Sequence, residues 1–204
     1  MNKIKNILKR MGVSEILVKK IRRFLSAIGI DLRMKTYDRY VLESIIFPYL
    51  IKNKKYKKIV FIGTDYYTRS YCKIFRNKEF YTLEYDKKQA KFGCKLHIVD
   101  SFTEIDSYFK ESEVDVVICN GVYGYGLNLE DDVNKAFKAT YRVLRKDGLF
   151  IFGWNNCKER SPYDIENTQA FQLFKKFYFE PLKVDKYEVN THNGHTFNFF
   201  ITDK

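Results

Sequence analysis

A single glycine and an acidic residue are spaced as in proteins that bind a ribose. Gly63 directly follows the apolar run KKIVFI, and Glu84 lies 21 positions later, within the run FYTLEYD. An acid about 20 residues after such a glycine turn can accept hydrogen bonds from both hydroxyls of an adenosine ribose, since two donors match its two oxygens. We therefore expect an adenosine-containing ligand here. The residues expected to bind it are Gly63, Thr64, Asp65, Glu84, Tyr85 and Asp86.

Polar residues also follow three later apolar runs. Asp100 ends KLHIVD, Asn120 ends VDVVICN, and Asn155 ends LFIFGWN. Asp100 could contact an adenine amino group, or it could cap the helix that is expected after it. An amide both donates and accepts hydrogen bonds, so Asn120 and Asn155 are candidate ligand contacts, Asn155 on the acceptor side.

Two histidines are candidate general bases. His192 and His195 flank Asn193-Gly194, a strong hairpin signal between two apolar runs. Either could remove a proton from a bound hydroxyl, although a solvent-exposed histidine in a turn is the simpler interpretation. His97 lies inside an apolar run, where a core position is the better expectation.

Aromatic residues after the fourth strand could form a wall of an acceptor pocket. In NGVYGYG, Tyr123 and Tyr125 surround Gly124. Their ring faces would suit sugars or flat molecules. A packed loop with two surface tyrosines is the alternative.

No metal site is expected. The four cysteines, at positions 72, 94, 119 and 157, form no CxxC pair. Reduced thiols in a cytosolic protein are the expectation.

Short apolar runs alternate with helical patterns along most of the chain. Such alternation predicts an α/β fold with a doubly wound, mostly parallel sheet in three α/β/α layers. The chain ends in helix, strand, tight turn and strand, so we expect seven strands with the last one antiparallel. Strands are expected at 58–63, 80–86, 95–100, 114–121, 149–155, 181–189 and 196–204, and helices at 37–52, 68–76, 102–111, 128–146 and 167–179.

The first 36 residues differ from the rest. Residues 1–35 carry ten Lys or Arg and two acids, with apolar residues at helical spacing. We expect a basic amphipathic helical extension over 1–36 and one domain over 37–204. The extension could rest on a membrane surface or a partner, or it could be a cap helix packed on the domain with a solvated basic face.

Composition sets the general class. The chain has 204 residues, 45% hydrophobic and 30% charged, with a net charge of +12. This is typical of a globular protein, and no secretory leader or membrane-spanning run is seen, so we expect a cytoplasmic protein. The charge would attract nucleic acid, anionic lipid or acidic ligands.

Residues 37–204 resemble the class I S-adenosylmethionine-dependent methyltransferases. The resemblance is clearest over Val114–Asn155, where an apolar strand, a polar end, a loop, a helix ending in VLRKDG and a further apolar strand follow one another. In that family, alternate glycines let the backbone approach the cofactor. Here Asp65 and Tyr67 stand where the second and third glycines would be, and Phe61 stands where an acid is usual.

The resemblance implies S-adenosyl-L-methionine as cofactor and methylation of a small-molecule or glycan hydroxyl. Bacterial surface-polysaccharide or lipid-linked sugar pathways are the associated setting, with peripheral contact at the inner membrane surface as an option. Methylation of nucleic-acid bases is disfavoured, because NGVYG replaces the Asp/Asn-Pro-Pro-aromatic run expected after the fourth strand. The competing hypothesis is a methyltransferase-like scaffold that has lost the cofactor and acts as a binding partner.

Overall fold

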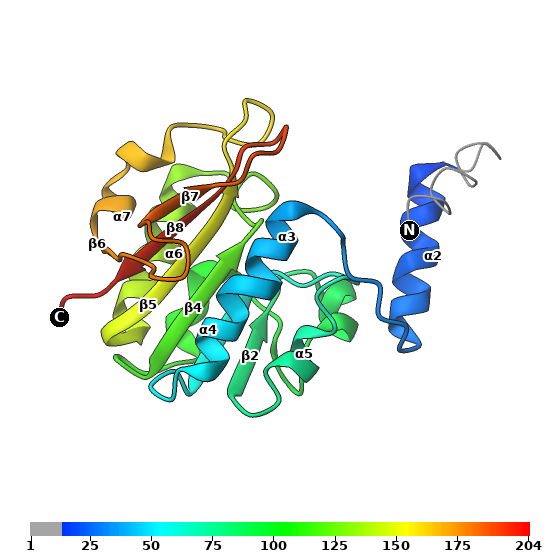
Figure 1. Ribbon diagram of the computed structural model, residues 1–204, viewed down its shortest axis with the longest axis horizontal. Helices are drawn as coiled ribbons and strands as arrows, with labels where there is room; N and C mark the ends of the chain where they lie inside the picture. Colours follow the sequence, from blue (N-terminus) through cyan, green and yellow to red (C-terminus); the bar gives the residue numbers. More distant parts are fainter. Residues whose placement is uncertain (1–13) are drawn as a thin grey trace.

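One sheet forms the centre of the protein. The computed structural model describes residues 14–204, and within them eight strands pair in the order β3-β2-β1-β4-β5-β8-β6, with β7 also paired to β8 (Figure 1). The part of the predicted N-terminal extension before residue 14 lies outside the described residues. The strands are β1 (Lys58–Ile62), β2 (Glu79–Leu83), β3 (Leu96–Ile98), β4 (Val114–Asn120), β5 (Leu144–Asn155), β6 (Lys175–Lys176), β7 (Lys186–Glu188) and β8 (His195–Ile201).

The strand directions confirm the predicted fold class. Strands β1 to β5 pair in parallel, and β8 runs antiparallel to β5. The short strands β6 and β7 both pair antiparallel with β8. They share the last position of the sheet, so the strand expected over 181–189 is reduced to three residues.

Helices cover both faces of the sheet, which makes the three expected layers. Alternate residues of each central strand point to opposite faces. On β1, Ile59 and Phe61 pack against α3, α4 and α5, while Val60 and Ile62 belong to the core under α6 and α7. The described helices are α2 (Glu15–Ala27), α3 (Tyr37–Val41), α4 (Phe47–Lys52), α5 (Tyr71–Ile74), α6 (Glu130–Val143) and α7 (Gln169–Gln172).

The helix expected over 37–52 is present, and its bend lies just before Pro48. A π-helical turn, Leu42–Ile46, joins α3 to α4, and the Phe47 amide donates to the Leu42 carbonyl. Proline has no amide hydrogen and its ring crowds the preceding turn, which explains the irregularity.

Three predicted helices are shorter than expected. The helix over 102–111 is only the 3-10 segment Phe102–Ser107. The helix over 167–179 is only α7, because Lys175 and Lys176 leave the helix and pair with the end of β8. The helix over 68–76 is only α5, after a series of turns. Short elements depend on tertiary pairing more than on local pattern.

The expectation of four reduced thiols is wrong. Cys72 on α5 and Cys94, just before β3, are joined by a disulfide, with their Cα atoms 5.3 Å apart. Cys119 and Cys157 are free. The bond connects the segment after β1 to the segment after β2, two segments that both border the cleft.

Candidate cofactor and acceptor site

The carboxyl ends of the central strands border a cleft of about 1100 Å³. The strand order reverses between β1 and β4, and this is where open parallel sheets bind ligands. Most of the residues predicted to bind a ligand line this cleft. They are Gly63, Thr64, Asp65, Glu84, Tyr85, Asp86, Asn120, Tyr125, Asn155, His192 and His195.

Gly63 and Glu84 come together as expected. Gly63 has a φ of +88°, a region that favours glycine, and its amide donates to the Leu83 carbonyl over 2.8 Å. The Glu84 carboxylate accepts from the Thr64 amide at 3.0 Å and from the Asp86 amide at 2.9 Å. Two backbone donors thus fix both oxygens at the edge of the cleft. Each oxygen keeps a lone pair for a further donor.

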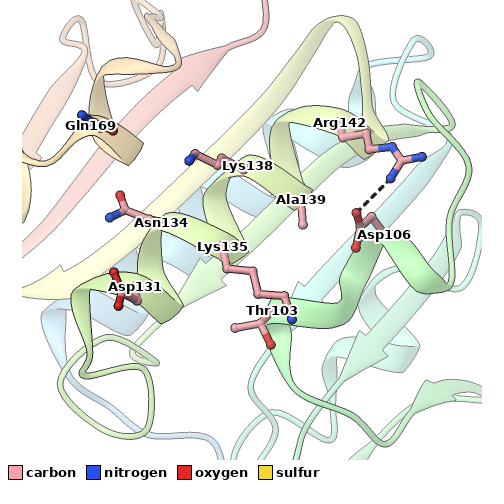
Figure 2. A pocket seen from close by; sticks show the side chains of 9 residues that line it. All are labelled: Thr103, Asp106, Asp131, Asn134, Lys135, Lys138, Ala139, Arg142 and Gln169. Carbon is pink, nitrogen blue, oxygen red and sulfur yellow. Dashed lines mark hydrogen bonds and ion pairs between the residues drawn. The ribbon is translucent and has the colours of Figure 1, made fainter.

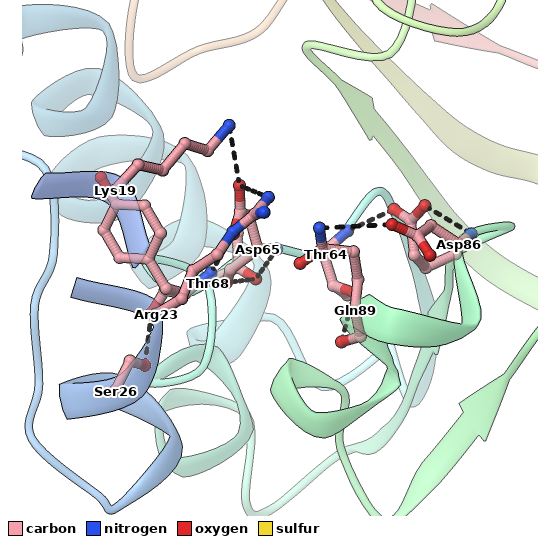
Figure 3. Close-up of polar contacts among 10 residues, drawn as sticks. Lys19, Arg23, Ser26, Thr64, Asp65, Thr68, Asp86 and Gln89 are labelled. Atoms are coloured by element: carbon pink, nitrogen blue, oxygen red, sulfur yellow. Dashed lines mark hydrogen bonds and ion pairs between the residues drawn. The ribbon is translucent and has the colours of Figure 1, made fainter. Parts of the chain in front are cut away.

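The turn after β2 adds polar groups beside Glu84. Asp86 caps the short helix Lys87–Phe92, where its side chain accepts from the Lys88 amide at 2.9 Å. Gln89, one turn on, lines the cleft, and its side-chain oxygen is buried without a hydrogen-bond partner (Figure 3). Sequence reasoning missed Gln89, whose only signal was its place just after the acidic strand end.

Asp100 lies apart from these groups. Its carboxylate accepts from the Tyr108 hydroxyl and the Ser101 amide, both at 2.7 Å. These two bonds hold the pKa of Asp100 below its usual value, the Tyr108 bond having the larger effect. Ser101, rather than Asp100, caps the following helical turn and lines the cleft.

Asp65 faces the N-terminal helix. The Arg23 guanidinium on α2 donates to both Asp65 oxygens, at 3.0 and 3.1 Å, and the Lys19 ammonium lies 3.8 Å away (Figure 3). The Asp65 amide donates to the Thr68 hydroxyl. The carboxylate that replaces a family glycine is therefore neutralised by the extension.

At the other end of the cleft, His195 is held between two asparagines. The ring is 5% exposed, with Nδ1 2.6 Å from Asn155 Oδ1 and Nε2 3.1 Å from Asn120 Oδ1. Gly153 makes room for this group, because a Cβ there would lie 2.0 Å from Asn120 Oδ1. The three polar residues come from β8, β4 and β5.

Burial keeps the His195 ring neutral. It lowers the pKa of His195 to about 4, while the nearby Asp38 and Arg39 act in opposite directions. A neutral ring has one N–H, so when Nδ1 donates to Asn155, Nε2 carries a lone pair. Asn120 satisfies that lone pair by turning its NH₂ group to the ring. In either orientation, one amide atom of Asn120 stays available toward the cleft.

A buried arginine lies beside this group. Arg39 on α3 is 7% exposed; its guanidinium donates to the Tyr71 hydroxyl at 3.1 Å and stacks 4.7 Å from the centre of the Tyr67 ring. Its Nε is buried without a hydrogen-bond partner. Tyr67, which replaces a family glycine, thus packs against Arg39 and leaves Gly63 and Glu84 in contact through Thr64. Sequence reasoning missed Arg39, because a lone arginine in a helix carries no motif.

The two tyrosines predicted to line the acceptor pocket have different positions. Tyr123 is fully buried and donates to the Tyr163 carbonyl at 2.7 Å, so it forms core and does not line the cleft. The Tyr125 hydroxyl instead accepts from the Asn155 amide at 2.9 Å, and the Arg160 guanidinium covers its ring at 4.3 Å. Tyr125 therefore has the wall position that was expected of both.

His192 is exposed, in contrast to His195. It lies in the turn before β8 and borders the cleft. Only His195 is fixed in place by neighbouring polar groups.

A second cavity, of about 590 Å³, lies between α6 and the turn Phe102–Ser107. Figure 2 shows its polar lining, where Arg142 pairs with Asp106 at 3.2 Å. Lys135 similarly pairs with Glu104. These cations are already neutralised, and none of the predicted site residues lies there. Within residues 14–204, no group of His, Cys, Asp or Glu side chains could hold a metal ion.

Comparisons with known proteins agree with the geometry. Residues 62–152 match the family model described as "Methyltransferase domain". That segment runs from the end of β1 to β5 and includes the glycine turn, Glu84 and Asn120. A search of curated protein sequences finds no match.

Solved structures share the fold at low sequence identity. The N-methyltransferase NodS from Bradyrhizobium japonicum is 10% identical, with a TM-score of 0.61 over 85% of this chain and 100% of that one. A TehB-like SAM-dependent methyltransferase from Corynebacterium glutamicum is 16% identical, with a TM-score of 0.56 over 91% of this chain and 95% of that one. A SAM-dependent methyltransferase from Archaeoglobus fulgidus is 12% identical, with a TM-score of 0.56 over 81% and 93%. At these identities the likeness shows the fold alone.

Proposed function

We propose that the chain, whose residues 62–152 match the model of a methyltransferase domain, is an S-adenosylmethionine-dependent methyltransferase that methylates a hydroxyl group of a small molecule or a glycan. S-adenosylmethionine supplies an electrophilic methyl group on a sulfonium. The acceptor class extends to surface or lipid-linked sugars. The setting we propose is bacterial polysaccharide biosynthesis in the cytoplasm. Contact of residues 1–35 with a membrane stays a prediction at this point.

The cofactor residues follow from the chemistry of the cleft. Glu84 would accept hydrogen bonds from the ribose hydroxyls, because its oxygens are fixed by two amides and keep free lone pairs. Gln89 lies one turn on and would face the adenine side. Arg39 and Asn120 would meet the methionine portion, the guanidinium suiting its carboxylate.

Three buried polar atoms support this assignment best. Gln89 Oε1, Arg39 Nε and one side-chain amide atom of Asn120 have no hydrogen-bond partner, and all three residues line the cleft. An unpaired buried polar group costs about 1–3 kcal/mol, so each favours a ligand that completes its bonds. Together with the Glu84 carboxylate at the edge of the cleft, they carry the proposal.

His195 would act on the acceptor. As the acceptor oxygen bonds to the methyl carbon and the carbon–sulfur bond breaks, the hydroxyl proton must leave. His195 Nε2 would receive that proton when the acceptor hydroxyl replaces Asn120 as its hydrogen-bond partner, with Nδ1 donating to Asn155 and the ring held against Phe197. A low pKa makes the ring a weak base, so holding the hydroxyl in line with the methyl group is as important as proton removal.

Calorimetry with S-adenosylmethionine tests the proposal. We expect wild type to bind, and Glu84→Ala to weaken binding by about 100-fold or more, because each lost hydrogen bond to a charged group is worth about 1.5–3 kcal/mol. Glu84→Gln keeps one acceptor oxygen and should fall between them. Glu79→Gln, at the exposed start of β2, the strand that Glu84 follows, is the matched control.

Two results would contradict it. Wild type that gives neither heat nor a thermal shift with the cofactor would favour the scaffold hypothesis. Unchanged affinity in a folded Glu84→Ala protein would mean that the ribose binds elsewhere.

A further inference from the structure

Helix α2 packs on the domain with its polar side. Ser26 is fully buried, and its hydroxyl donates to the Tyr66 carbonyl at 2.8 Å. Arg23 on the same side donates to Asp65 (Figure 3). Arg69 donates to the Ser26 carbonyl. α2 thus packs on the domain through Ser26 and Arg23, so part of its basic face is turned to the domain instead of to solvent.

The apolar side of α2 therefore faces away from the domain. Leu17, Ile21, Phe24 and Ile28, which we call the outer stripe, are spaced by four, three and four residues and share one face. They are 47%, 40%, 64% and 62% exposed. Figure 1 shows α2 at the edge of the molecule, joined to α3 by an extended segment. A continuous apolar face of this kind indicates a surface that another apolar phase covers.

The charge of the residues around the outer stripe indicates which apolar phase covers it. Lys20 on α2 is exposed, and Arg33 and Lys35 are exposed on the segment that follows. Residues 1–35 carry ten basic residues against two acids. An anionic bilayer supplies both an apolar interior and opposite charge. A second copy of the chain would bring two strongly basic segments together, and a nucleic acid would offer no apolar interior.

The same helix borders the cleft. Val18, Lys19, Arg22 and Arg23 line it opposite Thr64 and Asp65. No helix within residues 14–204 is long and apolar enough to cross a membrane, so the contact would be peripheral. A bilayer that covers the outer stripe would lie one helix diameter, about 10 Å, from the lining of the cleft.

We propose that the outer stripe seats the protein on an anionic lipid surface, and that the methyl acceptor is an amphiphile held in that surface. Only the claim about the acceptor rests on the proposed function. Lipid binding itself needs no cofactor and no acceptor.

Cosedimentation of the full chain with vesicles tests the seating. Vesicles of phosphatidylcholine with 30% phosphatidylglycerol, a probe composition, should bind wild type, while pure phosphatidylcholine should bind at least tenfold more weakly. Phe24→Ser/Ile28→Ser should raise the lipid concentration for half-binding at least tenfold, because both side chains lose apolar burial. Leu129→Ser/Tyr178→Ser, two exposed apolar residues on other elements, should bind as wild type does.

Several outcomes would overturn the seating. Lipid seating is wrong if wild type stays in the supernatant with anionic vesicles. It is also wrong if the stripe variant pellets with the vesicles as well as wild type does. Wild type could instead bind no lipid and sediment as a dimer, with the stripe variant a monomer in sedimentation velocity. That result would assign the outer stripe to contact with a second copy of the chain.

The acceptor class has its own readout. With methyl-labelled S-adenosylmethionine and membranes of the native host, we expect label in the organic-soluble fraction, reduced at least fivefold for the stripe variant. If the label appears only in water-soluble products, the proposal that the acceptor is an amphiphile is wrong. Calorimetry of the stripe variant with S-adenosylmethionine should match wild type, so loss of lipid binding is distinguishable from loss of the proposed activity.

Discussion

The two ends of the cleft are built in different ways. At one end, Glu84 accepts from the Thr64 and Asp86 amides and Gly63 donates to the Leu83 carbonyl, all between residues 63 and 86. At the other, His195 meets Asn120 and Asn155 across separations of 75 and 40 residues. The first end depends on one strand–helix–strand unit, β1, α5 and β2, while the second exists only once β4, β5 and β8 lie side by side.

This difference separates binding from chemistry. A local unit with a charged acceptor can hold the common part of a cofactor with little dependence on the rest of the fold. A group assembled from three strands is sensitive to sheet packing, and it holds the neutral imidazole. If the two ends work independently, variants at one should leave the function of the other unchanged.

Replacing His195 should have the largest effect on turnover. We expect His195→Ala to lower kcat by about 100-fold, the usual size for loss of a general base, with the affinity for S-adenosylmethionine changed less than twofold. The measurement is label transfer to whichever hydroxyl acceptor wild type methylates, beside calorimetry of the cofactor. His192→Ala should change kcat less than threefold, because that side chain is exposed in its turn.

A different pattern would contradict the separation of the two ends. Equal losses in kcat and cofactor affinity for His195→Ala would mean that His195 mainly supports cofactor binding. A larger loss of kcat for His192→Ala than for His195→Ala would mean that His192, in the turn, is the general base.

The sequence predicts the local end better than the assembled one. Spacing alone connects Gly63 with Glu84, and the hydrogen bonds confirm that the two lie together. Asn120, Asn155 and His195 were each found one at a time, since each follows or opens a strand. Their meeting could not be read from spacing, because it depends on the register of β8 against β5, where His195 pairs with Asn155.

Other parts of the site left no signal in the sequence. Arg39 lies on a helix whose polar and apolar residues look like any surface helix, yet tertiary packing buries it against Tyr67 and Tyr71. The disulfide joins cysteines 22 residues apart, a pairing that spacing does not specify. The outward apolar stripe of α2 is likewise a matter of packing, since its periodicity is equally compatible with an inward stripe.

Substituting Gly153 should damage the assembled end alone. In Gly153→Ala the Cβ would lie 2.0 Å from Asn120 Oδ1 and 3.1 Å from His195 Nε2, both buried. We expect a loss of about 2–3 kcal/mol in the free energy of unfolding, as for an overpacked core, measured by urea denaturation. Turnover should fall while cofactor affinity holds.

Gly126→Ala, in the loop after β4, is the matched control, because its added Cβ would approach Tyr85 of the local end. Its Cβ would lie 3.3 Å from the ring of Tyr85, which is exposed and free to move. A loss below about 0.5 kcal/mol is expected, as for an ordinary surface substitution. Equal losses for the two variants would show that the assembled end is no more tightly packed than the local one.

The smallest expected effect is a dependence of stability on pH that belongs to the assembled end. His195 has a pKa of about 4 in the folded protein and an ordinary value near 6.5 when unfolded. Between these values the unfolded chain binds the extra proton, so stability from this group is present above pH 6.5 and is lost as pH falls toward 4. By linkage the loss between pH 7 and pH 4.5 is about 2 kcal/mol. The difference in urea unfolding free energy between wild type and His195→Gln, followed over that range, isolates the group, because other titrations cancel. If the two proteins lose stability in parallel, the ring is charged or exposed in the folded state, and the assembled end does not hold a neutral imidazole.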